Sequence, residues 1–96
     1  MSVVQTITLA PGASTGWHYH PGRVDVVVLS GVLTRTLHDG TVEVSGAGRR
    51  LVEQPGPAHV HVGRNHGEEP VVLVATYHLP QWCPTAVAAA APEWSR

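Results

Sequence analysis

Two short stretches of the sequence each carry a pair of histidines separated by one residue, His18 with His20 and His59 with His61. On a β-strand, residues i and i+2 point to the same face, so each stretch directs two imidazoles the same way. If the two strands lie near each other, the four imidazoles converge on one point. Imidazole nitrogens bind first-row transition metals, so the pattern predicts a site for a divalent metal, whether Zn, Fe, Ni, Mn or Cu.

Two further residues are candidates for proton transfer. Asp25 follows the first histidine pair, where it is a candidate general base or distal ligand. An ion pair with an arginine at the surface is the alternative for this residue. His78 lies in the last predicted strand and is a candidate catalytic residue, with a core or surface role as the alternative, because the sequence does not fix its face.

Short β-branched segments separated by glycine and proline turns must position these side chains. Strands are predicted over residues 3–9, 17–20, 24–29, 32–38, 41–44, 51–54 and 71–79, with the second histidine pair between the last two. Asp39-Gly40 is a strong hairpin signal between two of them. Such a series of short strands predicts an all-β sandwich or barrel.

The sequence divides into a barrel domain, residues 1–80, and a C-terminal tail, residues 81–96. The alanine-rich run over residues 85–91 is long enough for about two helical turns. A helix of that length is not stable alone and must dock on the barrel. The tail is therefore expected to be a short helix or irregular.

Composition limits the class of protein. The sequence has 96 residues, of which 43% are hydrophobic and 14% charged, as is typical of one compact domain. The formal net charge is -1 and there is no basic patch, so we expect no binding to nucleic acid. All six basic residues are arginine, which excludes chemistry based on a lysine nucleophile or Schiff base.

The sequence also bears on location. Cys83 is the single cysteine and cannot form an internal disulfide, which favours a cytoplasmic protein. The first ten residues lack the basic and apolar regions of a signal peptide. No apolar run approaches the roughly 20 residues of a membrane span, so we expect no membrane association.

The residues around the first histidine pair resemble the first sequence motif of the cupin family. Gly12 is followed after five residues by His18-Tyr19-His20, and Gly31 closes the motif. The second cupin motif is similar to the residues around the second pair. Its first part matches residues 56–59 and its second part matches residues 61–65. The resemblance covers roughly residues 3–79, nearly the whole predicted barrel.

The resemblance implies a double-stranded β-helix, or jelly-roll barrel, with a metal site built from the two motifs. Two departures from the family pattern bear on that site. The position of the family's metal-binding glutamate falls on Val24, which cannot ligate. Strand alternation turns Asp25 away from that position unless a bulge intervenes. The second motif is stretched by two residues, so His59 and His61 compete for one role. Four histidines, or three with water, would replace the missing carboxylate, and the first of these is the preferred set.

The resemblance implies a small metal-dependent cupin enzyme acting on a small organic molecule held in the barrel. Isomerase, cyclase, lyase and oxygenase chemistry all remain open. The alternative is a non-catalytic module that binds a small ligand or is stabilised by its metal. A homodimer is also predicted, because a small open sandwich leaves edge strands that need covering.

Overall fold

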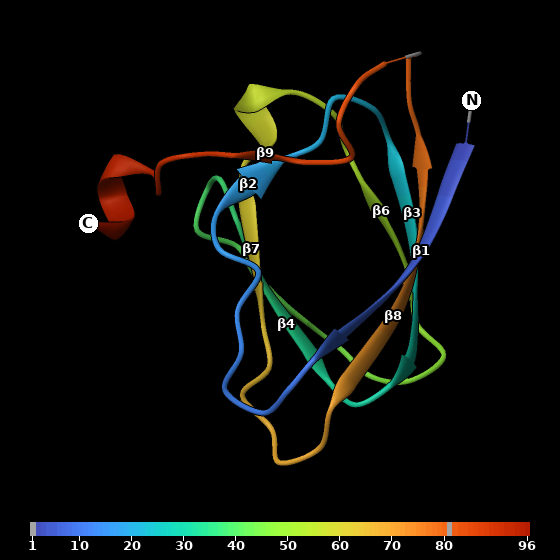
Figure 1. The fold of residues 1–96 in the computed structure, drawn as a ribbon. Helices are drawn as coiled ribbons and strands as arrows, with labels where there is room; N and C mark the ends of the chain where they lie inside the picture. Colours follow the sequence, from blue (N-terminus) through green and yellow to red (C-terminus); the bar gives the residue numbers. More distant parts are fainter. Residues whose placement is uncertain (1, 81) are drawn as a thin grey trace.

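Two antiparallel β-sheets face each other and enclose the core, as Figure 1 shows. The computed structural model describes residues 2–80 and 82–96. The strand orders are β1-β8-β3-β6 in the first sheet and β5-β4-β7-β2-β9 in the second. The strands are β1 (Ser2–Leu9), β2 (His18–Tyr19), β3 (Val24–Ser30), β4 (Leu33–Leu37), β5 (Val42–Ser45), β6 (Arg50–Glu53), β7 (His61–Arg64), β8 (Val71–His78) and β9 (Val87–Ala88). Two 3-10 turns, η1 (Pro57–His59) and η2 (Glu93–Ser95), complete the structure.

This architecture confirms the all-β jelly-roll prediction. The core lies between the sheets and is made by strands whose side chains alternate inward and outward. On β3, Val24, Val26 and Val28 are 1%, 5% and 0% exposed, whereas the residues between them are partly exposed. On β8, the inward positions run from Val71 to Tyr77 and are equally buried. Burial of these apolar side chains is the main force that holds the two sheets together.

Glycines allow close contacts at both ends of β3. A Cβ added to Gly22, just before β3, would lie 1.8 Å from the carbonyl oxygen of His78. Gly31, just after β3, has a φ of +77° and would place its Cβ 2.4 Å from the carbonyl oxygen of Pro70. Larger residues at these positions would push the ends of β8 away from β3.

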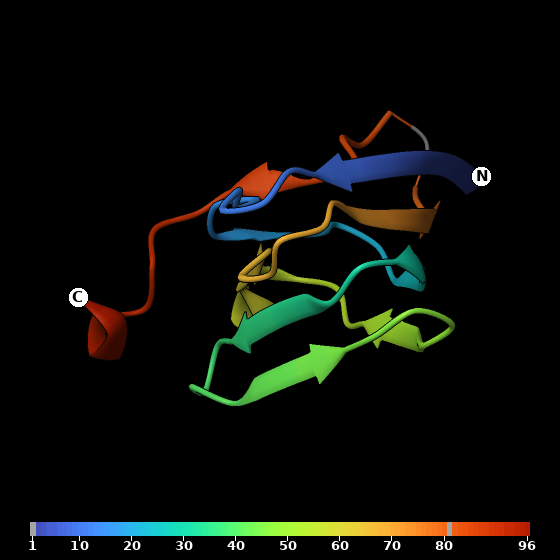
Figure 2. The same cartoon turned by 90° about the horizontal axis from the view of Figure 1, so that it is seen from below.

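The C-terminal residues 82–96, which we call the C-terminal strap, are extended rather than helical over the alanine-rich run. Of the two alternatives expected for the tail, a short helix or an irregular segment, the helix does not form over residues 85–91, because Val87–Ala88 form β9 and pair with β2. An isolated helix of this length has little stability of its own, whereas the edge of β2 offers hydrogen-bond partners. Figure 2 shows the strap, in orange and red, running past β2 to η2, which stands apart from the sheets. No helix in the described part of the chain is long and apolar enough to cross a membrane.

Candidate metal centre

Three histidines from two strand segments converge inside the barrel. His18 lies on β2, His20 follows it by two residues, and His61 begins β7, where it pairs directly with His18. The ring centroids are 4.8 Å apart for His18 and His20, 4.4 Å for His18 and His61, and 5.0 Å for His20 and His61. One nitrogen from each ring lies within 4.8 Å of the others. We call these residues the three-histidine cluster.

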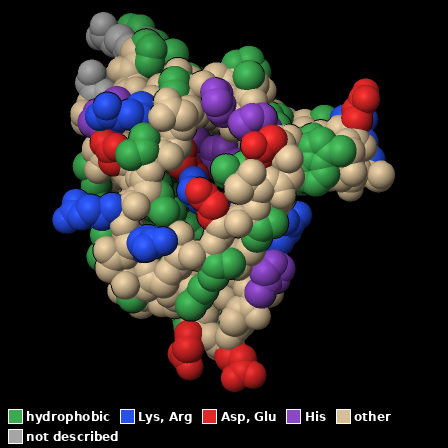
Figure 3. Space-filling model, turned by 180° about the vertical axis from the view of Figure 1, so that it is seen from behind, with side chains coloured by type: hydrophobic (Ala, Val, Ile, Leu, Met, Phe, Trp, Pro, Cys, Tyr) green, Lys and Arg blue, Asp and Glu red, His purple; other side chains and the backbone are tan. Residues whose placement is uncertain are grey.

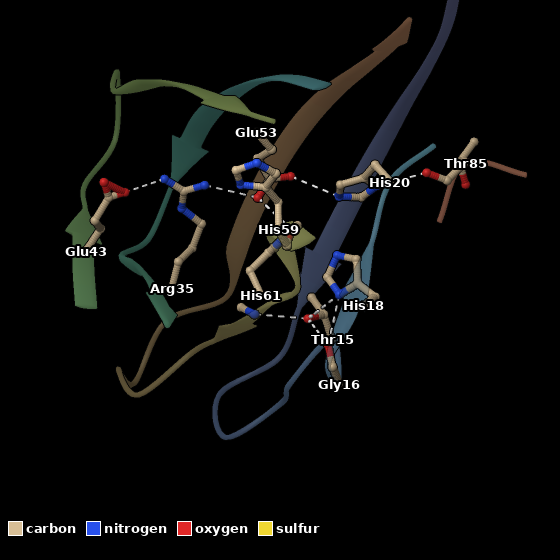
Figure 4. Close-up of polar contacts among 11 residues, drawn as sticks. Thr15, Gly16, His18, His20, Arg35, Glu43, Glu53, His59, His61 and Thr85 are labelled. Carbon is tan, nitrogen blue, oxygen red and sulfur yellow. Dashed lines mark hydrogen bonds and ion pairs between the residues drawn. The ribbon is translucent and has the colours of Figure 1, made fainter. Parts of the chain in front are cut away.

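Backbone carbonyls fix the orientation of all three rings. Figure 4 draws the three histidines with the residues that supply these carbonyls. A carbonyl oxygen only accepts hydrogen bonds, so each Nδ1 facing one carries the proton and each Nε2 keeps a free lone pair. Metal-binding histidines are held in this way. The Nδ1 atoms of His18, His20 and His61 donate to the carbonyls of Gly16 (2.9 Å), Thr85 (2.8 Å) and His59 (3.0 Å), respectively.

The Nε2 atoms of His20 and His61 are the observation that fits a metal ion. Both are buried, and neither makes a hydrogen bond within the part of the chain that the structure describes. The carboxylate oxygens of Glu53 lie 3.1 Å from each of them, but without hydrogen-bond geometry. Lone pairs on two nitrogens and two oxygens therefore face one another, an arrangement that a cation placed among them would stabilise.

Glu53 reaches the cluster from β6, where it pairs directly with Val24 of β3. Its carboxylate is anchored by Arg35, whose guanidinium lies 3.1 Å away. Arg35 is only 6% exposed and also pairs with Glu43 (Figure 4). This buried cation compensates for the desolvation of the carboxylate.

Sequence reasoning missed Glu53 as a site residue. Part of its position could be predicted, because Leu51 and Glu53 alternate with exposed neighbours on β6 and therefore share the inward face. The pairing of Glu53 with Val24 could not be predicted from this alternation, because it joins segments far apart in sequence.

Burial and the Glu53 carboxylate set the protonation of the cluster. Burial alone would raise the pKa of Glu53, but its contacts with His20 and His61 outweigh this and hold the pKa well below its usual range. For His61, burial would lower the pKa, but the contact with Glu53 is stronger and raises it. For His18, burial lowers the pKa, so this ring favours the neutral, metal-binding form.

Two cavities are each lined by at least two histidines of the cluster. An inner cavity of about 50 Å³ lies between the sheets, with the three histidines, Arg35, Glu53 and Tyr77 on its walls. A wider groove of about 310 Å³ opens over His18 and His20. Its other lining residues are Ile7, Thr15, Trp17, Tyr77, Ala86 and Ala88. Figure 3 shows histidine side chains beside a hollow of the surface in which positive and negative side chains meet.

The structure brings together three of the four predicted ligands and leaves out His59. Its ring lies 5.1 Å from that of His38, and both line a third cavity of about 120 Å³, which Glu53 and His61 also border. The structure therefore groups three of the four predicted histidines and places His59 outside that group. Gly56, with a φ of +101°, and Pro57 start the turn η1, so His59 is not on a strand and the i, i+2 rule does not hold between it and His61.

Asp25 and His78, the candidate catalytic residues, pair with each other. The Nε2 atom of His78 lies 2.6 Å from the Asp25 carboxylate, which Arg23 also contacts at 3.4 Å. Both belong to the partly exposed positions of β3 and β8, which alternate with the buried core positions. They therefore occupy the outer face of the first sheet, opposite to the face that bears the cluster.

Comparison with known proteins agrees with the architecture. The cupin domain family model matches residues 5–77. A protein with a double-stranded β-helix domain from Klebsiella pneumoniae is 33% identical, with 78% of this chain and 64% of that chain covered and a TM-score of 0.69. A cupin-like protein from Thermotoga maritima is 22% identical, with 94% and 65% covered and a TM-score of 0.82. No curated protein matches the chain.

The polyketide cyclase RemF from Streptomyces resistomycificus also shares the fold, at 22% identity, with 96% of this chain and 63% of that chain covered and a TM-score of 0.77. The present chain spans slightly less than two thirds of the length of each of these three structures. The family match covers most of the chain and includes the three-histidine cluster. The chain is a member of the cupin domain family.

Proposed function

We propose that this protein is a small metal-dependent cupin enzyme acting on a small organic molecule that reaches the three-histidine cluster through the groove. The buried Nε2 atoms of His20 and His61, which face the Glu53 carboxylate without a hydrogen bond, carry the proposal. Buried polar atoms are almost always satisfied in folded proteins, so two such atoms at one point indicate a binding site for a cation.

The chain's own residues would supply three nitrogens and one carboxylate. His18, His20 and His61 would bind through Nε2, and Glu53 is the candidate for an oxygen ligand. Two ligand atoms about 2.1 Å from one metal lie about 3.0–3.4 Å apart at octahedral or tetrahedral angles. The 3.1 Å separations between Glu53 and the two imidazoles fall in that range. A metal held there would supply a Lewis acid for an enol, carbonyl or carboxylate oxygen.

The size of the cavities limits the substrate. The inner cavity of about 50 Å³ has room for little more than a polar end group, whereas the groove of about 310 Å³ can hold a larger body. Ile7, Trp17 and Ala86 make much of the groove apolar. The substrate class is therefore a compact molecule with an apolar body and an oxygen-bearing end directed at the cluster.

Tyr77 lines both cavities and is the candidate to hold the substrate's oxygen. Burial, and then the negative charge of Glu53, raise the pKa of its hydroxyl. The phenol therefore keeps its proton at neutral pH and can donate a hydrogen bond to an oxygen that gains negative charge. The structural neighbour RemF, a polyketide cyclase, is an example of an enzyme built on this fold.

A non-catalytic module is the second candidate, and the small inner cavity favours it. If three histidines and Glu53 close a four-coordinate shell, no position is left for a substrate, as in structural metal sites. The number of open coordination positions separates the two candidates.

Metal analysis of single variants tests the proposed site. We expect His18→Ala and His61→Ala to lose bound metal after gel filtration, whereas His59→Ala, two residues from His61, keeps wild-type content. Elemental analysis of protein loaded with Zn²⁺ is the measurement. Equal loss of metal in His59→Ala, or a wild type that retains none, would contradict the site.

A Co²⁺-loaded sample separates enzyme from module. We expect azide, added as a small exogenous ligand, to change the visible absorption spectrum, because an enzyme keeps an open coordination position. A spectrum that saturating azide leaves unchanged would favour the structural module instead.

A further inference from the structure

The C-terminal strap lies beyond the residues that the cupin family model matches, yet it pairs with β2, the strand that bears His18 and directly precedes His20. β9 pairs with β2 through His18 with Ala88 and Tyr19 with Val87. The amide of Ala89 donates to the carbonyl oxygen of Trp17 at 3.0 Å. On its other side, β2 pairs with β7 through His18 and His61 alone. Much of the support for β2 therefore comes from the strap.

The strap also holds the ring of His20 directly. The carbonyl oxygens that orient His18 and His61 come from residues two positions away in sequence, so local backbone geometry supplies them. The carbonyl that orients His20 belongs to Thr85, which is 65 positions away. The tautomer and direction of this one imidazole therefore depend on the docking of the strap.

A tryptophan anchors the far end of the strap. The ring of Trp94 meets that of Trp17 edge to face, with centroids 6.1 Å apart and an angle of 82°. Its Nε1 atom donates to the carbonyl oxygen of His38 at 2.7 Å. Trp17 directly precedes His18, so the anchor ties the strap to the same segment that carries the histidines. Pairs of this kind contribute about 0.5–1.5 kcal/mol beyond the burial of their surface.

We propose that the C-terminal strap positions the metal centre, with the Thr85 carbonyl holding His20 and the Trp94 anchor holding the strap. The proposal rests on the proposed function, in which the three-histidine cluster binds a metal. Docking of the strap and binding of the metal then stabilise each other, because each favours the same orientation of His20. Thr85 and Trp94 are positioning residues, since they act through His20 and Trp17.

Removal of the anchor tests this coupling. We expect Trp94→Ala to weaken Zn²⁺ binding about tenfold in a competition titration against a chromophoric chelator, because the support of a ligand is lost. The visible spectrum of the Co²⁺-loaded variant should also change, since His20 is no longer held in one orientation. Trp94→Phe keeps an aromatic ring against Trp17 and should recover most of the affinity.

Trp82 provides a matched control in the same strap, because its side chain is 90% exposed. Trp82→Ala should bind Zn²⁺ as the wild type does. If Trp94→Ala matches the wild type in both affinity and Co²⁺ spectrum, the strap has no positioning role while the metal site stands. If the wild type itself binds no metal, the strap proposal fails together with the proposed function.

Hydrogen exchange gives a second measurement, whose main comparison uses the wild type with and without Zn²⁺. Zn²⁺ should slow exchange of the Ala89 amide in the wild type and leave it unchanged in His61→Ala, where the metal site is broken but Thr85 and His20 remain. Equal exchange of this amide with and without Zn²⁺ in a metal-binding wild type would overturn the coupling.

Discussion

The carboxylate of Glu53 contacts several titratable or charged side chains at once. It lies 3.1 Å from an imidazole nitrogen of His20 and of His61 and is held from the other side by Arg35. These contacts lower the pKa of Glu53 and raise the pKa of His61, so protonation of His61 competes with the neutral form whose Nε2 lone pair faces the carboxylate. A metal would require the neutral imidazole, so its binding would be coupled to the loss of a proton from His61.

The interaction of Glu53 with His61 should make the free energy of unfolding depend on pH. Glu53 has a lowered pKa, so its contribution is present above the unfolded value of about 4.3 and is lost as the pH falls. His61 has a raised pKa, so its contribution is present below about pH 6.5 and is lost as the pH rises through the folded value. The difference in free energy of unfolding between wild type and Glu53→Gln should therefore be largest between about pH 4.3 and 6.5.

Urea unfolding with a chelator present, from pH 4 to 8, measures this difference. Glu43→Gln is the matched control, because Glu43 also pairs with Arg35 but its side chain is 42% exposed and outside the cluster. The difference between wild type and this control should vary little with pH over the same window. A Glu53→Gln difference that is the same at every pH would show that the pair contributes no charge-dependent stability.

At the scale of the strands, regular alternation could be predicted from the sequence, and its interruptions could not. His18 and His20 share a face because they lie on or beside a continuous strand, as the i, i+2 pattern predicts. His59 fails the same rule because η1 interrupts the backbone just before β7. Of the two alternatives for the strap, the helical one does not form over residues 85–91, because the edge of β2 gives this segment a tertiary partner that local propensity ignores.

The register of β3 and β6 explains the missing glutamate of the first motif. The family position falls on Val24, and Glu53 lies directly opposite on the neighbouring strand, where its carboxylate is the proposed replacement. Paired residues on adjacent strands share a face, so one carboxylate can replace the other in space. The replacement of a carboxylate on β3 by one on β6 depends on the pairing of strands that are far apart in sequence.

Moving the carboxylate across the strand pair tests this view. We expect Glu53→Val to lower Zn²⁺ affinity on the order of tenfold or more, because a ligand or its near neighbour is lost. Val24→Glu combined with Glu53→Val should recover part of that affinity, whereas Val27→Glu with Glu53→Val should not, since Val27 lies on the outer face. Chelator competition measures all three variants, and equal affinities for the two double variants would contradict the exchange.

At the scale of the whole molecule, a chain of 96 residues has a modest core, and further contacts are expected to support it. β5 is an edge strand of the second sheet, and its residues Val42 and Val44 are 58% and 62% exposed. An exposed apolar edge strand is a ready site for pairing with another copy of the same chain. This keeps the homodimer as a prediction and places its interface at β5.

Sedimentation at micromolar concentration should give a particle of twice 10.2 kDa for the wild type. Val44→Glu should shift it to the monomer, because a charge would be buried at the β5 interface. Val4→Glu is the matched control, since Val4 is 63% exposed on β1, at the edge of the other sheet. A 10.2 kDa particle for the wild type would count against the dimer.

The edge-to-face contact of Trp17 and Trp94 also gives the molecule an optical signal of its own. Trp82 is 90% exposed and emits as a solvated indole whether or not the strap is docked. Release of the strap would bring the other two rings into water together and shift their fluorescence to longer wavelength. The attachment of the strap can therefore be followed in real time without any added label.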